Sequence, residues 1–376
     1  MTMPASEDAR QDRFSPRRKR DVMILVTIAA LALLLLAAEA AIRLRQTLKY
    51  GTTTTFEEYF TLDARTGLRV PVASLSKGHI SINSLGFRGP EIAVPKPDGI
   101  VRIAFLGAST TWCAEVSGND HAWPHLVTNA LSRSFPDVRF DYVNAGVPGY
   151  TVGSILKTLT SRVLPLEPDV IVIYEATNNL SGEMRDLAAK AGIITESAVQ
   201  ELSWPSRYSL MWYLVEKNLR VQNAQQTARH GGKLLEVDAH TVGDEYRNGL
   251  TRIVDTARRN AKLVVVATFS IQPRRNQTPD QQMRASASAH FYTPFLAPGT
   301  LMDAYEQYNK IAREVAREAG VLLIEGEDRI PGDAVHFTDT VHFTDAGSKA
   351  MALRVSQTLV SSSRFKQSLP APSRQP

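Results

Sequence analysis

The chain has 376 residues, of which 43% are hydrophobic and 22% charged, and this composition excludes an intrinsically disordered protein. Its formal net charge of +5 comes from the two ends, because residues 1–21 carry +2 and residues 362–376 carry +3. The stretch between them has no net charge, so its composition does not indicate a nucleic-acid partner. The single cysteine, Cys113, excludes an intramolecular disulfide framework.

An apolar segment, residues 22–42, follows the basic tail of residues 1–21 and is interrupted only by Glu39. Its 21 residues would form a helix of about 31 Å, close to the thickness of a hydrocarbon core. Lys and Arg are more frequent before this segment than after it, which predicts a cytoplasmic N-terminus, a single-pass anchor in the inner (cytoplasmic) membrane and a periplasmic body. A cleaved signal peptide is the alternative, since Ala38-Glu39-Ala40 fits a small-x-small cleavage site. We favour the anchor because the apolar run is long for a signal peptide.

Candidate strands and helices alternate along most of the remaining chain. We expect residues 43–98 to be a juxtamembrane segment of loops and short strands. From residue 99, continuous apolar runs indicate buried parallel strands at 101–107, 139–146, 169–176, 261–269 and 321–326. Helical spacing of apolar residues predicts helices at 123–133, 154–163, 244–259, 301–319 and 345–359. This order predicts an α/β fold over residues 99–361, a three-layer α/β/α sandwich with a five-stranded parallel sheet.

Two insertions, at residues 180–243 and 270–300, interrupt this alternation. The first contains an aromatic-rich helix candidate, and the second is rich in arginine and aromatic residues. Insertions of this length are often lids or binding loops, but their aromatic residues could equally pack the insertion onto the body. The aromatic residues of the first are Trp204, Tyr208, Trp212 and Tyr213. We expect the Ser-, Pro- and Gln-rich segment 362–376 to be disordered.

Polar residues gather at the predicted carboxyl ends of the strands, where open parallel sheets bind ligands. Ser109 follows the first strand, Gly149 follows the second and Asn178 follows the third. The loop after the fifth strand contains two copies of Asp-x-x-His. Each feature alone is common in turns, but together they would supply a nucleophile, oxyanion donors, a base and a residue that orients the base. The pattern favours acyl transfer.

Four short blocks of the sequence resemble those of the SGNH hydrolases, the GDSL-like lipase/acylhydrolase family. The similarity covers roughly residues 80–360, and two flanking stretches, INSLGFRGPE before the first strand and HAWPHLV after the serine, look like the membrane-anchored bacterial members. The resemblance implies a flavodoxin-like fold and an esterase that needs no metal and no cofactor. The four blocks are Gly107-Ala108-Ser109, Asn144 to Gly149, Asn178, and Asp339-Thr340-Val341-His342.

The resemblance also implies a role for each block. Ser109 would be the nucleophile, His342 the general base, and Asp339 the residue that holds the imidazole. The backbone N–H groups of Ser109 and Gly149 and the side-chain amide of Asn178 would form the oxyanion hole. Such donors stabilise negative charge that develops only in the tetrahedral state.

Two positions depart from the family pattern. The residue before the serine is usually Asp, and here it is Ala108. The residue after the asparagine of the third block is often Asp, and here it is Asn179. Neither lost carboxylate belongs to the triad, so we expect an altered specificity rather than a loss of activity.

The doubled segment 332–347 offers two candidates for the base. His342 stands just before a predicted helix, as the base does in the family, whereas His336 is followed by no helix. We therefore assign the base to His342 and leave His336 as a spare or substrate-contacting residue. A metal site formed by both histidines with Asp339 and Asp345 is disfavoured, because consecutive i, i+3 steps do not provide the open position of a catalytic metal.

Together these features predict a membrane-anchored serine esterase that deacylates a cell-surface or extracytoplasmic glycan or another acylated small molecule. Two alternatives stay open. An O-acyltransferase in exopolysaccharide modification would form the same acyl-enzyme and pass the acyl group to a sugar hydroxyl, so only the exclusion of water would separate it from a hydrolase. A non-catalytic glycan-binding relative is the second alternative, and the intact Ser, Asn, Asp and His argue against it.

Overall fold

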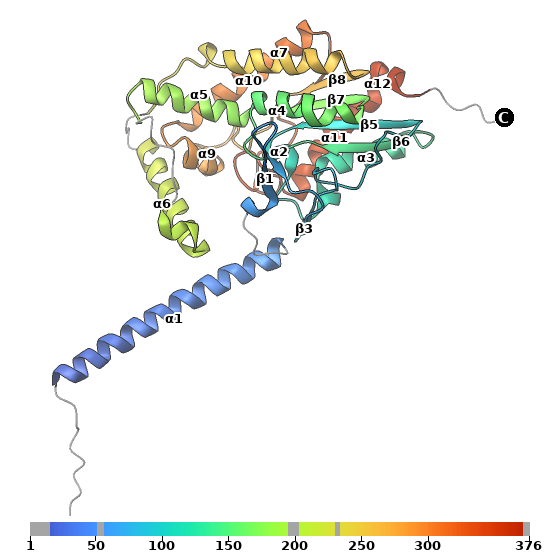
Figure 1. Cartoon of the computed structure of the whole chain (residues 1–376). Coiled ribbons are helices and arrows are strands. Elements are labelled where there is room, and N and C mark those ends of the chain that lie inside the picture. Colours follow the sequence, from blue (N-terminus) through green and yellow to red (C-terminus); the bar gives the residue numbers. More distant parts are fainter. Residues whose placement is uncertain (1–15, 51–55, 195–202, 230–233, 371–376) are drawn as a thin grey trace, which may run out of the picture.

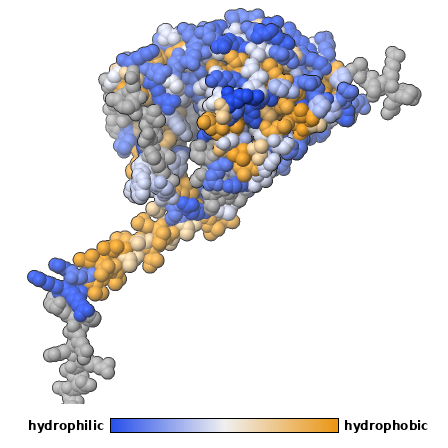
Figure 2. All heavy atoms as spheres, in the orientation of Figure 1, coloured by the Kyte–Doolittle hydropathy of each residue, from blue (hydrophilic) through white to orange (hydrophobic). Residues whose placement is uncertain are grey.

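The computed structural model describes residues 16–50, 56–194, 203–229 and 234–370. A long helix, α1 (Pro16–Tyr50), extends from a body in which helices cover both faces of a sheet (Figure 1). One stretch of α1, Arg17–Leu48, is long and apolar enough to cross a membrane, although a signal sequence would satisfy the same criterion. Its apolar side chains form a continuous exposed band (Figure 2). Most of the basic tail, residues 1–15, lies outside the described residues.

The central sheet has five parallel strands in the order β6-β5-β7-β8-β9, which confirms the predicted α/β architecture. The three inner strands are buried along their whole length except for Ile100 at the start of β5, as expected for a sheet covered on both faces. Because the chain turns to opposite sides of β5, the carboxyl ends of β5 and β7 meet at a topological switch point. The strands are β5 (Ile100–Gly107), β6 (Arg139–Asn144), β7 (Val170–Tyr174), β8 (Leu263–Ala267) and β9 (Leu322–Ile324).

Two layers of helices complete the sandwich (Figure 1). The helices α3 (Trp123–Ser134) and α11 (Asp345–Ser361) pack together on one face. On the other face lie α4 (Val152–Thr158), α7 (Asp244–Arg258) and α10 (Pro298–Glu318). These five helices confirm the predicted ones to within a few residues. The boundaries shift because caps rather than apolar spacing set them: Thr344 accepts a hydrogen bond from the Gly347 N–H and begins α11.

The segment before the sheet contains short strands, as expected, but it is part of the body. Tyr59, Phe60, Ile82 and Phe87 are buried in the same hydrophobic core as the sheet, so the predicted boundary at residue 99 was wrong. Turns separate these core residues and leave no regular period to recognise in the sequence. The elements are η1 (Phe56–Tyr59), β1 (Phe60–Asp63), β2 (Leu68–Pro71), β3 (Ser76–Lys77) and β4 (Ile80–Ser81).

The first insertion lies mostly outside the core. After α5 (Thr177–Lys190), it contains η5 (Trp204–Arg207), α6 (Leu210–Arg229) and η6 (Ala239–Thr241), whereas residues 195–202 and 230–233 lie outside the described residues. Trp204 and Tyr208 are 73% and 70% exposed, so these aromatic side chains do not pack the insertion onto the body.

The second insertion forms two short helices, α8 (Pro279–Ala285) and α9 (Ala287–Tyr292). Here Phe291 is buried, as the packing alternative predicted, while Tyr292 is 55% exposed. The helix α9 packs against α6, so the two insertions meet.

The C-terminal segment was wrongly predicted to be disordered over its first residues. Residues Ser363–Ser368 form α12, and Phe365 is fully buried against the rings of Phe135 and Phe140. One aromatic anchor outweighs a composition typical of disorder, because burying a phenyl ring stabilises a segment by about 1.5–3 kcal/mol. Residues 371–376 lie outside the described residues.

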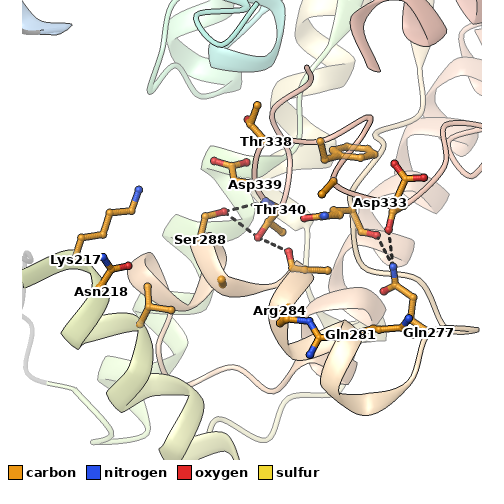
Figure 3. A pocket seen from close by; sticks show the side chains of 17 residues that line it. Lys217, Asn218, Gln277, Gln281, Arg284, Ser288, Asp333, Thr338, Asp339 and Thr340 are labelled. Carbon is orange, nitrogen blue, oxygen red and sulfur yellow. Dashed lines mark hydrogen bonds between the residues drawn. The ribbon is translucent and has the colours of Figure 1, made fainter. Parts of the chain in front are cut away.

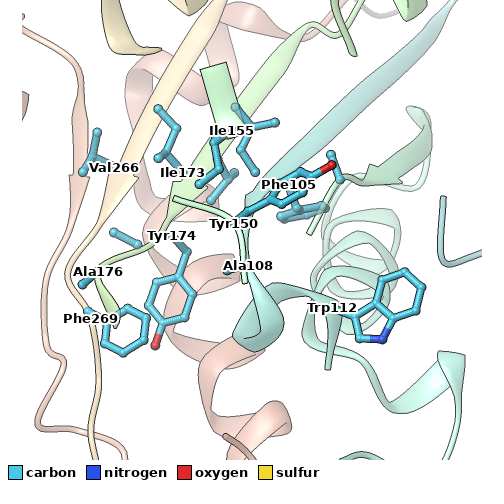
Figure 4. Close-up of a cluster of buried hydrophobic side chains, with 14 of the residues drawn as sticks. Phe105, Ala108, Trp112, Tyr150, Ile155, Ile173, Tyr174, Ala176, Val266 and Phe269 are labelled. Carbon is cyan, nitrogen blue, oxygen red and sulfur yellow. The ribbon is translucent and has the colours of Figure 1, made fainter. Parts of the chain in front are cut away.

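A cluster of buried side chains lies beneath the carboxyl ends of the strands (Figure 4). The rings of Tyr174 and Phe269 stack with their centroids 4.7 Å apart, and Phe105 meets Trp123 edge to face at 5.0 Å. Such aromatic pairs add about 0.5–1.5 kcal/mol to the free energy gained by burial. The cluster gives the loops at this edge a rigid floor.

Candidate active site

Ser109 begins the short helix α2 (Ser109–Trp112) directly after β5. The preceding Gly107 is required by close packing, because an added Cβ would collide with the Thr111 side chain and the Tyr174 carbonyl oxygen. Ala108, which stands where the family usually has Asp, is 1% exposed. The sharp turn from strand to helix places the Ser109 hydroxyl at the edge of the sheet.

The other end of α2 is held by Arg88, from the INSLGFRGPE stretch. This guanidinium is 1% exposed and donates to the carbonyl oxygens of Trp112, at 2.8 Å, and Cys113. It also donates from Nε to Asn119 Oδ1 at 2.8 Å. A buried arginine with several carbonyl partners fixes backbone strongly, since leaving the charge unpaired would be costly. The stretch before the sheet therefore acts on the site by positioning the helix that carries Ser109.

The loop after β9 brings His342 and Asp339 to Ser109. The Nε2 atom of His342 lies 2.8 Å from Ser109 Oγ, and its Nδ1 atom lies 2.9 Å from Asp339 Oδ2. Asp339 Oδ1 accepts hydrogen bonds from the N–H groups of Val341 and His342, both at 2.9 Å. Three side chains predicted from two distant blocks thus form one continuous chain of hydrogen bonds.

Charges around the imidazole control its protonation. Burial alone would lower the pKa of His342, but the carboxylates of Glu115 and Asp339 raise this pKa to about 9. Burial alone would raise the pKa of Asp339, yet His342 and the two N–H donors hold it at about 2. Both shifts favour the same state, a proton on the imidazole beside an ionised Asp339, so raising the pH favours the free base.

The second and third blocks lie beside the first. Gly149 has a φ of +85°, a left-handed conformation that favours glycine. Gly146 approaches α2 so closely that an added Cβ would lie 2.6 Å from the backbone nitrogen of Trp112. The Asn178 amide donates to the Tyr150 carbonyl oxygen at 2.8 Å and so joins the third block to the residue that follows the second. Within the described ranges, neither the Ser109 nor the Gly149 N–H donates to a protein acceptor.

Two acidic residues near the site were not predicted. Glu115 follows α2. Burial raises the pKa of its carboxyl group, and the opposing effect of the His342 charge only partly offsets this rise. Glu175 ends β7, is 4% exposed, and accepts a hydrogen bond from the Asn178 N–H at 3.1 Å. Burial raises the pKa of Glu175 to about 8. No sequence signal marks either residue, because their importance comes from burial and from neighbours distant in the chain.

Two other predicted positions have structural partners. Asn179, the second departure from the family pattern, accepts a hydrogen bond from the Val152 N–H at 2.9 Å and so caps the beginning of α4. Asp345, weighed above as a metal ligand, binds Ser117 instead, through the N–H at 2.8 Å and the hydroxyl at 2.6 Å.

A cavity of about 530 Å³ opens beside Asp339, between α6, the second insertion and the doubled loop (Figure 3). Most of its labelled side chains carry amide, hydroxyl or charged groups, and these come from elements far apart in the sequence. The positive charge of Lys217 acts to lower the pKa of His342, so this α6 side chain lies within electrostatic reach of the imidazole. The polar lining includes Lys217, Asn218, Gln272, Gln277, Gln281, Arg284, Ser288, Asp333, Thr338, Asp339 and Thr340.

The chain is similar to several known proteins. Among solved structures, an acetyl xylan esterase from Geobacillus stearothermophilus is similar with 16% identity and a TM-score of 0.43, over 69% of this chain and 94% of that chain. An alpha/beta hydrolase enzyme from the metagenome of Lake Arreo, Spain, is similar with 17% identity and a TM-score of 0.41, over 69% of this chain and 94% of that one. A comparison with curated proteins gave no match. The model of one family, described as GDSL-like Lipase/Acylhydrolase, matches residues 105–350, more than half of the chain. The chain belongs to the GDSL-like lipase/acylhydrolase family, as its sequence blocks predicted, and is a carboxylic ester hydrolase.

Proposed function

We propose that the protein is a membrane-anchored serine esterase in which Ser109, His342 and Asp339 form the catalytic triad. One observation carries this proposal: His342 lies 2.8 Å from the Ser109 hydroxyl through one ring nitrogen and 2.9 Å from Asp339 through the other. This is the arrangement in which an imidazole can accept the hydroxyl proton while a carboxylate stabilises the resulting imidazolium.

The reaction then proceeds in two steps. His342 takes the proton of Ser109 as Oγ attacks the ester carbonyl carbon, and the imidazolium returns this proton to the departing alkoxide. Water next attacks the acyl-enzyme, gives its proton to His342, and releases the carboxylic acid as Ser109 regains its hydrogen. The N–H groups of Ser109 and Gly149 and the amide of Asn178 stabilise the tetrahedral oxyanion, and losing one donor costs about 2.7–4 kcal/mol.

The lining of the cavity beside Asp339 supports a glycan as the substrate. Three glutamine side chains and one asparagine lie there with Lys217, Arg284 and Ser288. Amide and hydroxyl groups can each donate and accept hydrogen bonds, which suits a ligand covered in hydroxyl groups. An acyl group on a cell-surface or extracytoplasmic polysaccharide is therefore the ester that we propose for this site.

The location of the enzyme is part of the same proposal. The span in α1 would cross the inner membrane once, with the excess of Lys and Arg before it holding the N-terminus in the cytoplasm. The body would then lie on the periplasmic side, where an extracytoplasmic glycan is accessible.

Assays of the full chain in detergent with p-nitrophenyl acetate, with and without an acceptor oligosaccharide, test this function. We expect release of nitrophenol and free acetate, abolished by Ser109→Ala and unchanged in the matched control Ser134→Ala on the exposed end of α3. Acetate found mainly on the oligosaccharide would make the enzyme an O-acyltransferase. The absence of turnover for every ester tested, in a folded protein, would leave only a binding role.

A further inference from the structure

Three aromatic side chains of the first insertion form an exposed patch. We call them the aromatic patch: they are Trp204, Tyr208 and Trp212, which are 73%, 70% and 45% exposed. The ring centroids of Trp204 and Tyr208 lie 5.5 Å apart. Side chains of this size usually bury most of their surface, so a group of them left in solvent indicates a partner. The triad and the cavity described above do not use these residues.

The aromatic patch lies where the body touches α1. The Glu39 carboxylate of α1 accepts hydrogen bonds from the Leu210 and Met211 N–H groups, at 3.0 and 2.9 Å, and from the Ser209 hydroxyl at 2.9 Å. It therefore caps the N-terminus of α6, where a negative charge is favourable. Arg43, one turn further along α1, donates to Glu39 at 2.7 Å and to the Tyr208 carbonyl oxygen at 3.2 Å. We call this set of contacts the Glu39 clamp.

The Glu39 clamp explains why the apolar segment 22–42 contains one acidic residue, Glu39. A carboxylate at this depth is costly unless it is paired, and here a helix N-terminus and an arginine compensate its charge. Its position near the C-terminal end of the segment brings the N-terminus of α6 against that end of α1. Figure 1 shows one end of α6 beside α1, well apart from the central sheet. The aromatic patch therefore lies beside the end of the apolar segment that is joined to the body.

We propose that the aromatic patch is embedded in the headgroup region of the bilayer that α1 crosses, and that the Glu39 clamp holds it there. Trp and Tyr favour this region because one end of each ring system is polar and the other apolar. The proposal rests on the membrane anchor of the proposed function. It adds a second attachment, which fixes the orientation of the body and sets α6, the carrier of Lys217, at a defined height above the lipid.

The same contacts bear on processing of the chain. Cleavage after Ala40 would remove Glu39 and leave the first N–H groups of α6 without their acceptor. An anchor that stays attached is consequently required for the Glu39 clamp, and N-terminal sequencing of the protein purified from membranes should find residues before Glu39.

Quenching by brominated lipids measures the depth of the aromatic patch. The full chain is reconstituted into phosphatidylcholine vesicles whose bromine atoms lie either near the headgroup end or near the terminus of the acyl chain. Two of the four tryptophans, Trp112 and Trp123, are fully buried in the body and serve as an internal reference. We expect stronger quenching by the shallow bromine, and loss of most of it in the W204F/W212F double variant. Equal fractional quenching in both proteins would overturn the proposal.

Two controls separate this proposal from the others. Flotation with the vesicles reports the anchor itself: a chain that floats without shallow quenching contradicts the patch alone, whereas a chain that does not float contradicts both. Hydrolysis of p-nitrophenyl acetate by W204F/W212F should equal that of the unaltered enzyme, so a failure of the esterase proposal remains visible independently.

The Glu39 clamp has its own variant. Glu39→Ala should lower the shallow quenching and make Trp204 and Trp212 more accessible to aqueous acrylamide. The matched control is Thr27→Ala, because the Thr27 hydroxyl donates only within α1, to the Met23 carbonyl oxygen. An identical quenching pattern in Glu39→Ala and Thr27→Ala would show that the clamp does not hold the patch.

Discussion

The two Asp-x-x-His copies of the doubled segment have the same local structure. In the first, Asp333 Oδ1 accepts from the Val335 and His336 N–H groups, both at 3.0 Å, and lies 2.8 Å from His336 Nδ1. Asp339 makes the same three contacts in the second copy. An antiparallel bridge between Phe337 and Phe343 pairs the two copies. Local sequence is sufficient to build an oriented imidazole, and it does so twice.

The copies differ in what surrounds them. Val335 is 64% exposed, whereas its counterpart Val341 is 5% exposed. His342 Nε2 reaches Ser109, while the Nε2 of His336 has no hydrogen-bond partner among the described residues. A position at the switch point of the sheet brings the Ser109 hydroxyl to the second copy, whereas the first copy lies beside the cavity.

A single side chain distinguishes the two motifs, Ala334 in the first and Thr340 in the second. The Thr340 hydroxyl donates a hydrogen bond to the Ala285 carbonyl oxygen at 2.9 Å. The same Thr340 hydroxyl accepts a hydrogen bond from the Ser288 hydroxyl at 2.9 Å (Figure 3). Thr340 is 1% exposed. This hydroxyl fastens the second copy to the second insertion, and alanine in the first copy cannot do the same.

The largest expected effect separates the two histidines. His342→Ala should lower kcat for p-nitrophenyl acetate on the order of 10⁴- to 10⁶-fold, because no base then activates Ser109. His336→Ala should change kcat by less than about tenfold, since the imidazole touches no reacting atom. Comparable losses in the two variants would show that the assignment of the base is wrong.

Substitutions of Asp339 and Asp333 should also differ in their effect on kcat. Asp339→Asn should lower kcat on the order of 10³- to 10⁴-fold, because an amide favours the wrong tautomer of His342 and cannot stabilise the imidazolium. Asp333→Asn is the matched control, and its kcat should stay close to that of the unaltered enzyme. Steady-state kinetics with circular dichroism checks both predictions, and an inactive but folded Asp333→Asn would contradict the comparison.

The oxyanion donors should have a smaller effect. Asn178→Ala removes the amide and should lower kcat about 10²- to 10³-fold with little change in KM, because the lost interaction exists only in the tetrahedral state. Asn179→Ala is the neighbouring control, since its amide caps α4. A change confined to KM in Asn178→Ala would argue against a role in the oxyanion hole.

The pH dependence tests the charges that surround only the second copy. Because the pKa of His342 is raised to about 9 and the free imidazole is the base, kcat/KM should rise with pH and level off only above that value. Glu115→Gln removes a negative charge near the imidazolium and should shift the midpoint to lower pH. Asp333→Asn should leave the midpoint unchanged. A profile already flat at neutral pH would contradict the charged environment described here.

The smallest effect concerns the residue that distinguishes the copies. Thr340→Ala should lower the free energy of unfolding by about 1–3 kcal/mol, because buried partners in the second insertion lose their hydrogen bonds. Thr338→Ala is the control, since its hydroxyl makes one exposed hydrogen bond to the His342 carbonyl oxygen. Urea unfolding measures both, and equal stabilities would mean that the Thr340 hydroxyl does not fasten the loop.

The sequence predicted the features that follow from local patterns. Buried strands and amphipathic helices have distinct periods, so the five strands, their helices and the edge that carries Ser109 and Asn178 could be located. It also chose His342 over His336, because only the former precedes a helix. It could not place Tyr59 or Phe365 in the core, since isolated apolar residues between turns carry no period.

Only the tertiary structure decided which groups meet. Burial and the charges of Glu115 and Asp339 set the protonation of His342, and Glu39 in the apolar segment finds its partners in a helix 170 residues away. Energies of this kind depend on distance and solvent exclusion, which no local pattern encodes. The local sequence is enough to orient an imidazole beside an aspartate in both copies of the motif. Only the packing of the whole fold brings one of these two imidazoles, His342, to the Ser109 hydroxyl.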